Sequence, residues 1–408
     1  MSGPSRRGLL TGGAAGAVGL AAGGLWGVGV SRPEPDPALA VTLSRGGPRN
    51  GLPPALLTPT PAHVRVVALE VVGDGGEEVA ARAREVVESW RDEIRALHEH
   101  GLEGVVEGAP TQGLRPASLG ITLGLGGSLL ERSGLGGRRP EELADLPDFA
   151  GDRLRQEWCG GDLMLHVGAE DPVVSGSAAR HLVGLAGDRV RVRWALPGFR
   201  RGAVTAKDPS STPRNLMGQI DGTVNPHPDQ AVFASQVLAV HPDPATAWMD
   251  GGAYVVVRRI RMLLDGWFAM PEHEREQVVG RRLDDGAPLG GSKEDDRPNL
   301  VARDDAGRSV IAQDAHIRLA SPENTLGARM LRRGFDYDLG WDSQGRVDAG
   351  LLFTAWQADP RTGFTAVQRS LDEGGDALGD HIRHEGSAVF AVPPAGEDGQ
   401  VPDPELWG

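Results

Sequence analysis

The order of strand and helix patterns between residues 64 and 199 limits the fold more than any other feature of the chain. Residues 64–72 are β-branched and bounded by glycine, and residues 77–97 carry apolar side chains at helical spacing without glycine or proline. Three more strand patterns and one helix pattern follow, in the segments 119–130, 161–171, 171–187 and 188–199. The order is β-α-β-β-α-β, which predicts a ferredoxin-like α+β domain with an antiparallel sheet and helices on one face.

The second half repeats this scheme less clearly. Strands are predicted at 253–263, 349–357 and 386–394, with helices at 267–283 and 363–373. A polar segment of about thirty residues, from about Asp284 to Gln313, separates them, and long loops of this kind are usually functional. We therefore expect two ferredoxin-like domains, at 63–212 and 213–396, after an irregular segment 41–62 and before a tail at 397–408.

The first forty residues are expected to be an export signal. Arg6 and Arg7 precede a long uncharged stretch that is rich in glycine and alanine, which is typical of a twin-arginine signal. Ala38–Ala40 offers a small-residue cleavage site, although an uncleaved anchor remains the alternative. That route carries folded proteins, often with a cofactor, so the expected location is periplasmic, extracellular or at the cell envelope.

Charge and cysteine content exclude some classes of function. The formal net charge of -14 argues against nucleic acid or an anionic membrane as the main partner. The single cysteine, Cys159, rules out an intrachain disulfide. No zinc-type cluster, phosphate-binding loop or dinucleotide fingerprint appears in the sequence.

Three short segments carry the candidate catalytic and ligand-binding residues. In the first, "RNLMGQIDGTVNP", Asp221 lies in a loop dense in glycine and proline, which is either a turn cap or a carboxylate aimed at a reactive group. In the second, "QDAHIRLASP", the imidazole of His316 is either a core residue or a ligand, and haem iron is a common partner of such a histidine. The third, "RMLRRGFDYD", places Arg332 and Arg333 among apolar residues.

Together these segments resemble the dye-decolourising peroxidase family. "NLMGQIDGTVNP" matches its G-x-x-D-G signature, "DAHIRLASP" its proximal-histidine segment and "MLRRGFDYD" its distal-arginine segment. The separations between them also fit, and the similarity runs from about Val64 to Pro394. It is strongest to the exported branch that includes deferrochelatases. The resemblance implies haem b held non-covalently between sheet and helices of two ferredoxin-like domains.

The resemblance also implies roles for individual residues. His316 is expected to be the proximal iron ligand, with Asp221 and Arg332 on the distal side as the catalytic pair. Arg259 is expected to bind a haem propionate, with Arg258 and Arg261 as alternatives, and Asp314, Asp376 and Asp380 are candidate partners of His316. The remaining haem contacts are expected from the backbone of Gly222, Thr223 and Val224, from Ser321, Pro322 and Glu323, and from Leu351 and Phe353, which wall the peroxide pocket.

The expected function is a haem peroxidase that reduces hydrogen peroxide and oxidises dyes or phenolic compounds. A carboxylate base stays ionised at mildly acidic pH, which predicts an acidic activity optimum. The alternative function is haem-iron handling of the deferrochelatase kind, which would add partners from an iron-uptake or export pathway. Only two tyrosines, Tyr254 and Tyr337, are present, so radical transfer to the surface would use these or tryptophan. The sequence does not indicate the oligomeric state.

Overall fold

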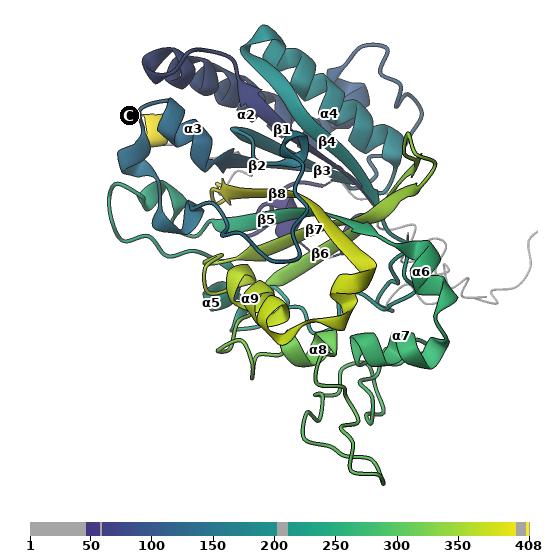
Figure 1. The fold of residues 1–408 in the computed structure, drawn as a ribbon. Coiled ribbons are helices and arrows are strands. Elements are labelled where there is room, and N and C mark those ends of the chain that lie inside the picture. Colours follow the sequence, from purple (N-terminus) through teal and green to yellow (C-terminus); the bar gives the residue numbers. More distant parts are fainter. Residues whose placement is uncertain (1–45, 58, 202–210, 397–404, 408) are drawn as a thin grey trace, which may run out of the picture. The chain divides into compact units, whose positions relative to one another are not determined.

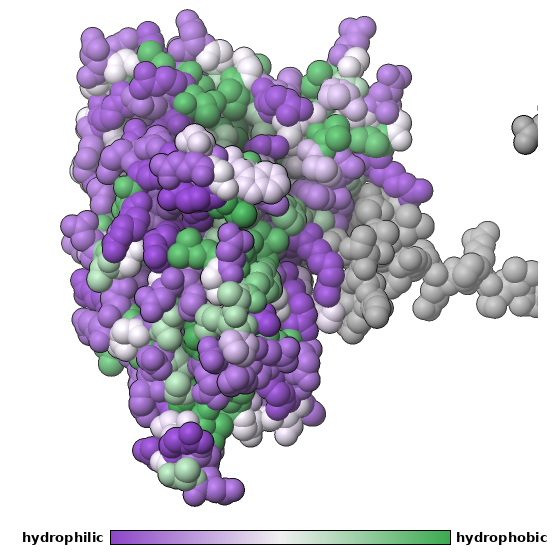
Figure 2. Space-filling model, turned by 45° about the vertical axis from the view of Figure 1, so that its right-hand side comes forward, coloured by the Kyte–Doolittle hydropathy of each residue, from purple (hydrophilic) through white to green (hydrophobic). Residues whose placement is uncertain are grey.

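The computed structural model describes residues 46–57, 59–201, 211–396 and 405–407. The predicted export signal at 1–40 lies outside these ranges, as does most of the predicted tail. In the described part of the chain, no helix is long and apolar enough to span a bilayer. Hydrophilic residues cover most of the face drawn in Figure 2, with hydrophobic ones between them.

The first half of the chain forms the predicted β-α-β-β-α-β unit. Its strands pair in the antiparallel order β4-β1-β3-β2, which is the ferredoxin-like order. Helices α2 and α4 lie side by side over one face of these strands (Figure 1). The elements are β1 (His63–Val71), α2 (Gly76–Val105), β2 (Gly120–Gly126), α3 (Gly127–Arg132), β3 (Leu163–Ala169), α4 (Pro172–Ala186) and β4 (Val190–Phe199).

Local sequence explains where these helices begin and what they bury. The Asp171 carboxylate caps α4 by accepting a hydrogen bond from the backbone N–H of Val173 at 2.7 Å, and Pro172 supplies a first helical residue that needs no donor. The apolar stripe of α2, which includes Val79, Trp90 and Ile94, packs with α4 and the outer face of the strands into one hydrophobic core.

The second half repeats the same strand order. Its strands pair as β6-β7-β5-β8, so each half has its first and third strands at the centre. The elements are α5 (Phe233–Val237), β5 (Ala253–Met262), α6 (Leu264–Ala269), α7 (Glu272–Val279), α8 (His316–Leu319), β6 (Leu331–Trp341), β7 (Val347–Gln357), α9 (Phe364–Gly374) and β8 (Ile382–Val392). The predicted helix at 267–283 is divided in two at Pro271. The prediction of two ferredoxin-like units with antiparallel sheets is confirmed.

Neither strand β6 nor the joining of the two sheets was predicted from the sequence. Strand β2 pairs with β8, and β4 pairs with β6 through Phe199 and Asp336, so the eight strands close into one barrel. Side chains from both halves, among them Val66, Trp194 and Trp356, fill its interior. The charges on successive residues of "LRRGFDYD" hid the strand pattern, because Arg333 and Asp336 are both buried.

The outer face of the second sheet positions the candidate site. Leu351 and Ile260 from this face pack with Ile317 of α8, whereas Leu352 points into the barrel interior. Helices α8 and α9 lie on the side of β6 and β7 away from α2 and α4 (Figure 1). The space between this face and α8 is therefore bounded by apolar side chains.

Candidate active site

Asp221 lies at the end of a short hairpin, residues 213–221. Arg214 and Ile220 form an antiparallel bridge, and the backbone N–H of Asp221 donates to the carbonyl of Pro213 at 2.9 Å. Gly218 and Gly222 adopt φ values of 82° and 120°, which residues with a side chain rarely adopt. The hairpin therefore fixes the backbone that carries the carboxylate, which accepts a hydrogen bond from the Asn215 amide at 3.4 Å.

The residues after this hairpin are attached to β6. The Asn225 side chain donates to the Arg332 carbonyl at 2.8 Å and accepts from the Arg332 N–H at 3.0 Å. The Arg332 guanidinium donates to the Thr223 carbonyl at 2.7 Å, and the Thr223 hydroxyl donates to Glu294 at 2.8 Å. Asp221 and Arg332, far apart in the sequence, are thus held on one framework. No ion pair joins them among the residues that the structure describes.

Both residues line a cavity of about 440 Å³. Its lining carries both signs of charge, from Arg200, Arg201, Arg332 and Arg333 and from Glu170, Asp221, Glu294 and Asp295. Gly222, Thr223 and Val224, which were expected to contact haem, also line it. His316 is not among the lining residues.

Leu351 and the Asp221 carboxylate both lie next to Gly334. Gly334 separates them, since a Cβ placed there would lie 3.1 Å from Asp221 Oδ2 and 3.3 Å from Leu351 Cδ1. Gly334 also pairs with Phe353 across β6 and β7, on the same face. The structure therefore brings Leu351 and Phe353 to the site with Asp221.

His316 is held by one carboxylate of the three that the sequence offered. Its Nδ1 lies 2.8 Å from Asp376 Oδ2, and Asp376 is itself fixed because it accepts from the Leu378 N–H at 3.1 Å. Within the described ranges Nε2 has no hydrogen-bond partner, and the side chain is 28% exposed. This arrangement is typical of a metal-binding histidine, because the carboxylate orients the ring and leaves the other nitrogen available.

The charges of Asp221 and Arg332 both influence the pKa of His316. Burial lowers the pKa of His316, but the Asp376 carboxylate outweighs burial, so the net pKa is raised. Smaller effects come from Arg332, which lowers the pKa, and from Asp221, which raises it. Asp221 and Arg332 therefore act on the His316 imidazole even though it does not line their cavity.

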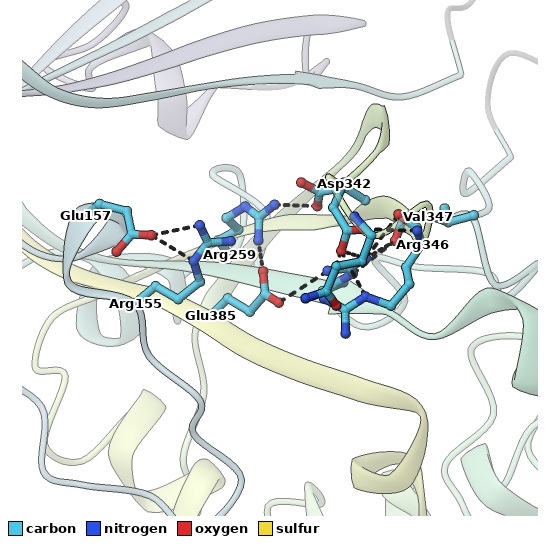
Figure 3. Close-up of polar contacts among 10 residues, drawn as sticks. Arg155, Glu157, Arg259, Asp342, Arg346, Val347 and Glu385 are labelled. Atoms are coloured by element: carbon cyan, nitrogen blue, oxygen red, sulfur yellow. Dashed lines mark hydrogen bonds and ion pairs between the residues drawn. The ribbon is translucent and has the colours of Figure 1, made fainter.

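Arg259 is not brought to this site. It pairs with Leu352 across β5 and β7, so its side chain lies on the barrel side of the sheet, opposite to Phe353. Its guanidinium forms ion pairs with Glu385 and Asp348 and stacks on the rings of Trp158 and Tyr337 at 4.8 Å from each centroid. Figure 3 shows Arg259 and Glu385 in an ionic network with Asp342 and Arg346.

The two alternative arginines also have carboxylate partners. Arg261 forms ion pairs with Asp342 at 3.1 Å and with Glu385 at 3.8 Å. Arg258 lies on the Phe353 face, where it is fully buried and pairs with Asp152 and with Ser387 at 3.0 Å. Of the three, only Arg258 faces the side of the sheet that carries the site.

The segment Ser321–Glu323 begins two residues after the end of α8 and is not part of the cavity lining. Glu323 pairs with Arg297 at 2.8 Å near the surface, while Ser321 is buried. This segment is therefore near His316 because it is close to it in sequence, and not because the two line one cavity. In the described part of the chain, no group of three or more His, Cys, Asp or Glu side chains suits a metal ion.

Comparison with known proteins identifies relatives of both halves. The family model "Dyp-type peroxidase, N-terminal" matches residues 53–200, and "Dyp-type peroxidase, C-terminal" matches residues 212–397. A dye-decolorizing peroxidase of Thermobifida fusca is 50% identical over 97% of this chain and 95% of its own length. A deferrochelatase of Yersinia pestis is 37% identical over 69% of this chain and 65% of its own length.

Solved structures agree with this result. An oxyferrous complex of DtpA from Streptomyces lividans superposes with a TM-score of 0.85 at 39% identity, covering 91% of this chain and all of the other. A DyP-type peroxidase from Cellulomonas bogoriensis superposes with a TM-score of 0.82 at 36% identity, covering 90% of this chain and 99% of the other.

Proposed function

Because the chain belongs to the Dyp-type peroxidase family over both family domains, we propose that it is a haem peroxidase that reduces hydrogen peroxide and oxidises dyes or phenolic compounds. One observation carries the assignment of the site. Asp221 and Arg332 line one cavity, while Asp376 orients the His316 ring and leaves its Nε2 without a partner among the described residues. A carboxylate, a guanidinium and an oriented imidazole are the groups that peroxide chemistry at haem requires.

The residues present suit haem. His316 Nε2 has no partner among the described residues, Asp376 holds the other ring nitrogen, and Leu351, Phe353 and Ile317 form an apolar wall nearby. His316 is the residue that would bind the iron, with Gly222 to Val224 along the cofactor. When bound, haem would supply the redox chemistry that these side chains lack, because it can provide the two electrons that cleavage of the O–O bond requires.

Asp221 moves the proton in the proposed mechanism. Hydrogen peroxide must lose a proton from one oxygen and gain one on the other before the O–O bond breaks heterolytically. A fixed carboxylate oxygen can accept that proton and return it. The glycines of the hairpin keep this oxygen in place, so little reorganisation is needed at each turnover.

Arg332 stabilises the charge that develops on the peroxide oxygens. Its guanidinium carries a delocalised positive charge, and Nη2 is oriented by the Thr223 carbonyl. In the described region no carboxylate forms an ion pair with Arg332, so its charge is available to a ligand in the cavity that it lines. Comparable oxyanion-stabilising donors contribute about 3 kcal/mol to the transition state.

Stopped-flow mixing with hydrogen peroxide tests both roles. We expect Asp221→Asn and Arg332→Leu each to slow the reaction of the haem protein by about 100-fold or more. Asp305→Asn and Arg329→Leu, at exposed positions, serve as matched controls and should react like the wild type. Wild-type rates in both site variants, with haem bound, would refute the assignment of the catalytic pair.

A second function is favoured by the deferrochelatase relatives. In that function the chain would release iron from haem and leave the porphyrin intact. Anaerobic incubation with haem distinguishes the two, because release of iron together with recovered protoporphyrin supports the second function. Steady peroxide-dependent dye oxidation without such release supports the first.

Export through the twin-arginine pathway is part of the proposal. It is supported by Arg6 and Arg7 ahead of an uncharged stretch. The test is to express the protein in a host with a twin-arginine pathway, locate it by cell fractionation and measure its mass. Protein that stays in the cytoplasm with an intact N-terminus would contradict export.

A further inference from the structure

Asp336 is a second carboxyl group beside Asp221. It lies on β6 at alternate positions from Arg332 and Gly334, so all three occupy the same face of the strand. Its side chain is 6% exposed. A buried carboxyl group in this place is unusual, because a charge removed from water is costly unless it is paired.

The hairpin that carries Asp221 also contacts Asp336. The backbone N–H of Leu216 donates to Asp336 Oδ1 at 2.9 Å, while Asp221 closes the same hairpin five residues later. On the strand, Gly334 lies two residues before Asp336, and a Cβ at Gly334 would meet Asp221 Oδ2 at 3.1 Å. One hairpin and one strand therefore hold the two carboxyl groups close together.

The surroundings of Asp336 favour its protonated form. The Leu216 N–H is the one hydrogen-bond donor to its carboxyl group among the described residues. No cation forms an ion pair with it there. Of the elements around it, the hairpin presents Asp221, the residue directly after β4 is Arg200, and β6 itself carries Arg332. Strand β7 presents no charge opposite, since Leu351 pairs with Asp336.

Together these surroundings raise the pKa of Asp336. Burial raises the pKa of Asp336 most, the Leu216 N–H lowers it, Asp221 raises it and Arg200 lowers it, with a result of about 7. Two neighbouring carboxyl groups commonly divide their protons in this unequal way.

We propose that Asp336 and Asp221 form a carboxyl pair in which Asp336 keeps its proton and Asp221 serves as the proton acceptor, and that loss of the Asp336 proton slows the reaction with peroxide. This inference rests on the proposed role of Asp221. Once Asp336 is ionised, its negative charge lies close to Asp221 and opposes the negative charge that develops on the peroxide oxygens. Asp336 thereby acts as a positioning residue that sets the alkaline limit of the reaction.

The pH dependence of the peroxide reaction tests the proposal. Stopped-flow rate constants of the holoenzyme are measured from mildly acidic to mildly alkaline pH for the wild type, Asp336→Asn and Asp221→Asn. Asparagine keeps an oxygen that accepts from Leu216 but cannot ionise. We expect the wild-type rate to fall with an inflection near neutral pH, and the Asp336→Asn rate to show no such inflection. An inflection that persists in Asp336→Asn belongs to another group and overturns the proposal.

Infrared spectroscopy supplies a readout that is independent of activity. Difference spectra of the wild-type holoenzyme with ¹³C-labelled aspartate should show a protonated carboxyl band that disappears through neutral pH and is missing in Asp336→Asn. Absence of that band from the wild type overturns the proposal even if the variant does not fold. If Asp221→Asn reacts at the wild-type rate, the proposed function fails, while the infrared result still decides whether Asp336 holds a proton.

Discussion

Replacing Asp336 by asparagine should stabilise the folded protein, and the gain should depend on pH. The wild-type carboxyl group is buried with one hydrogen-bond donor, so the folded state resists its ionisation. The unfolded chain exposes the same group to water, where it ionises with its ordinary pKa. The asparagine variant keeps the acceptor for Leu216 and removes this difference between the two states.

The magnitude follows from the two pKa values of Asp336. Folding raises its pKa from 3.8 to about 7. Below 3.8 both states hold the proton and nothing is lost. Between 3.8 and about 7 the unfolded state is ionised while the folded state keeps the proton, so the free energy of unfolding falls as pH rises. A difference of about three pKa units corresponds to about 4 kcal/mol in the free energy of unfolding. The wild-type protein has lost this whole amount above neutral pH.

Urea unfolding of the two proteins across this pH range measures the effect. The free energies of unfolding of wild type and Asp336→Asn should differ by a small constant near pH 4, and the variant should gain about 4 kcal/mol more by mildly alkaline pH. Both proteins carry the same cofactor, so its contribution cancels in the difference. A difference that does not change with pH would show that Asp336 ionises in the folded state as it does in water, and the reasoning would be wrong.

Three further substitutions test the rest of the site. His316→Ala should lose haem or shift its Soret band strongly, and unchanged haem content and spectrum would count against His316 as the ligand. Asp376→Asn should weaken haem retention by about 10- to 100-fold through loss of the oriented imidazole, measured by haem transfer to a scavenger; equal transfer rates would contradict that role. Gly334→Val should slow the peroxide reaction, because its side chain would meet both the Asp221 carboxylate and Leu351, whereas Gly184→Ala in α4, with open space around it, serves as the control. A wild-type rate in Gly334→Val would mean that the Asp221 carboxylate tolerates displacement.

Much of the fold could be predicted from the sequence because the relevant information is local. Alternation and helical periodicity identified β1, α2, β3, α4 and β4, and their order identified the ferredoxin-like unit. Burial of one face of each element produces these patterns whatever the rest of the chain does. The boundaries proposed for the two domains stay predictions.

The three chemical segments are also visible in the sequence, because glycine, histidine and arginine at fixed separations form short motifs. Their resemblance to one family is sufficient to predict haem chemistry. Motifs name residues, however, and do not show which face of a strand carries each side chain.

Tertiary structure decided that question. The pairing of β5 with β8 shifts register between Arg259 and Ile260, and pairing with β7 places Arg259 with Leu352 on the barrel side and Arg258 on the face of the site. Only the packing of α8 against the segment before β8 selects Asp376 as the partner of His316 over Asp314 and Asp380. The burial of Asp336 likewise depends on the pairing of β4 with β6, which closes the barrel between distant parts of the chain. These outcomes depend on contacts between residues far apart in sequence, whose geometry no local pattern encodes.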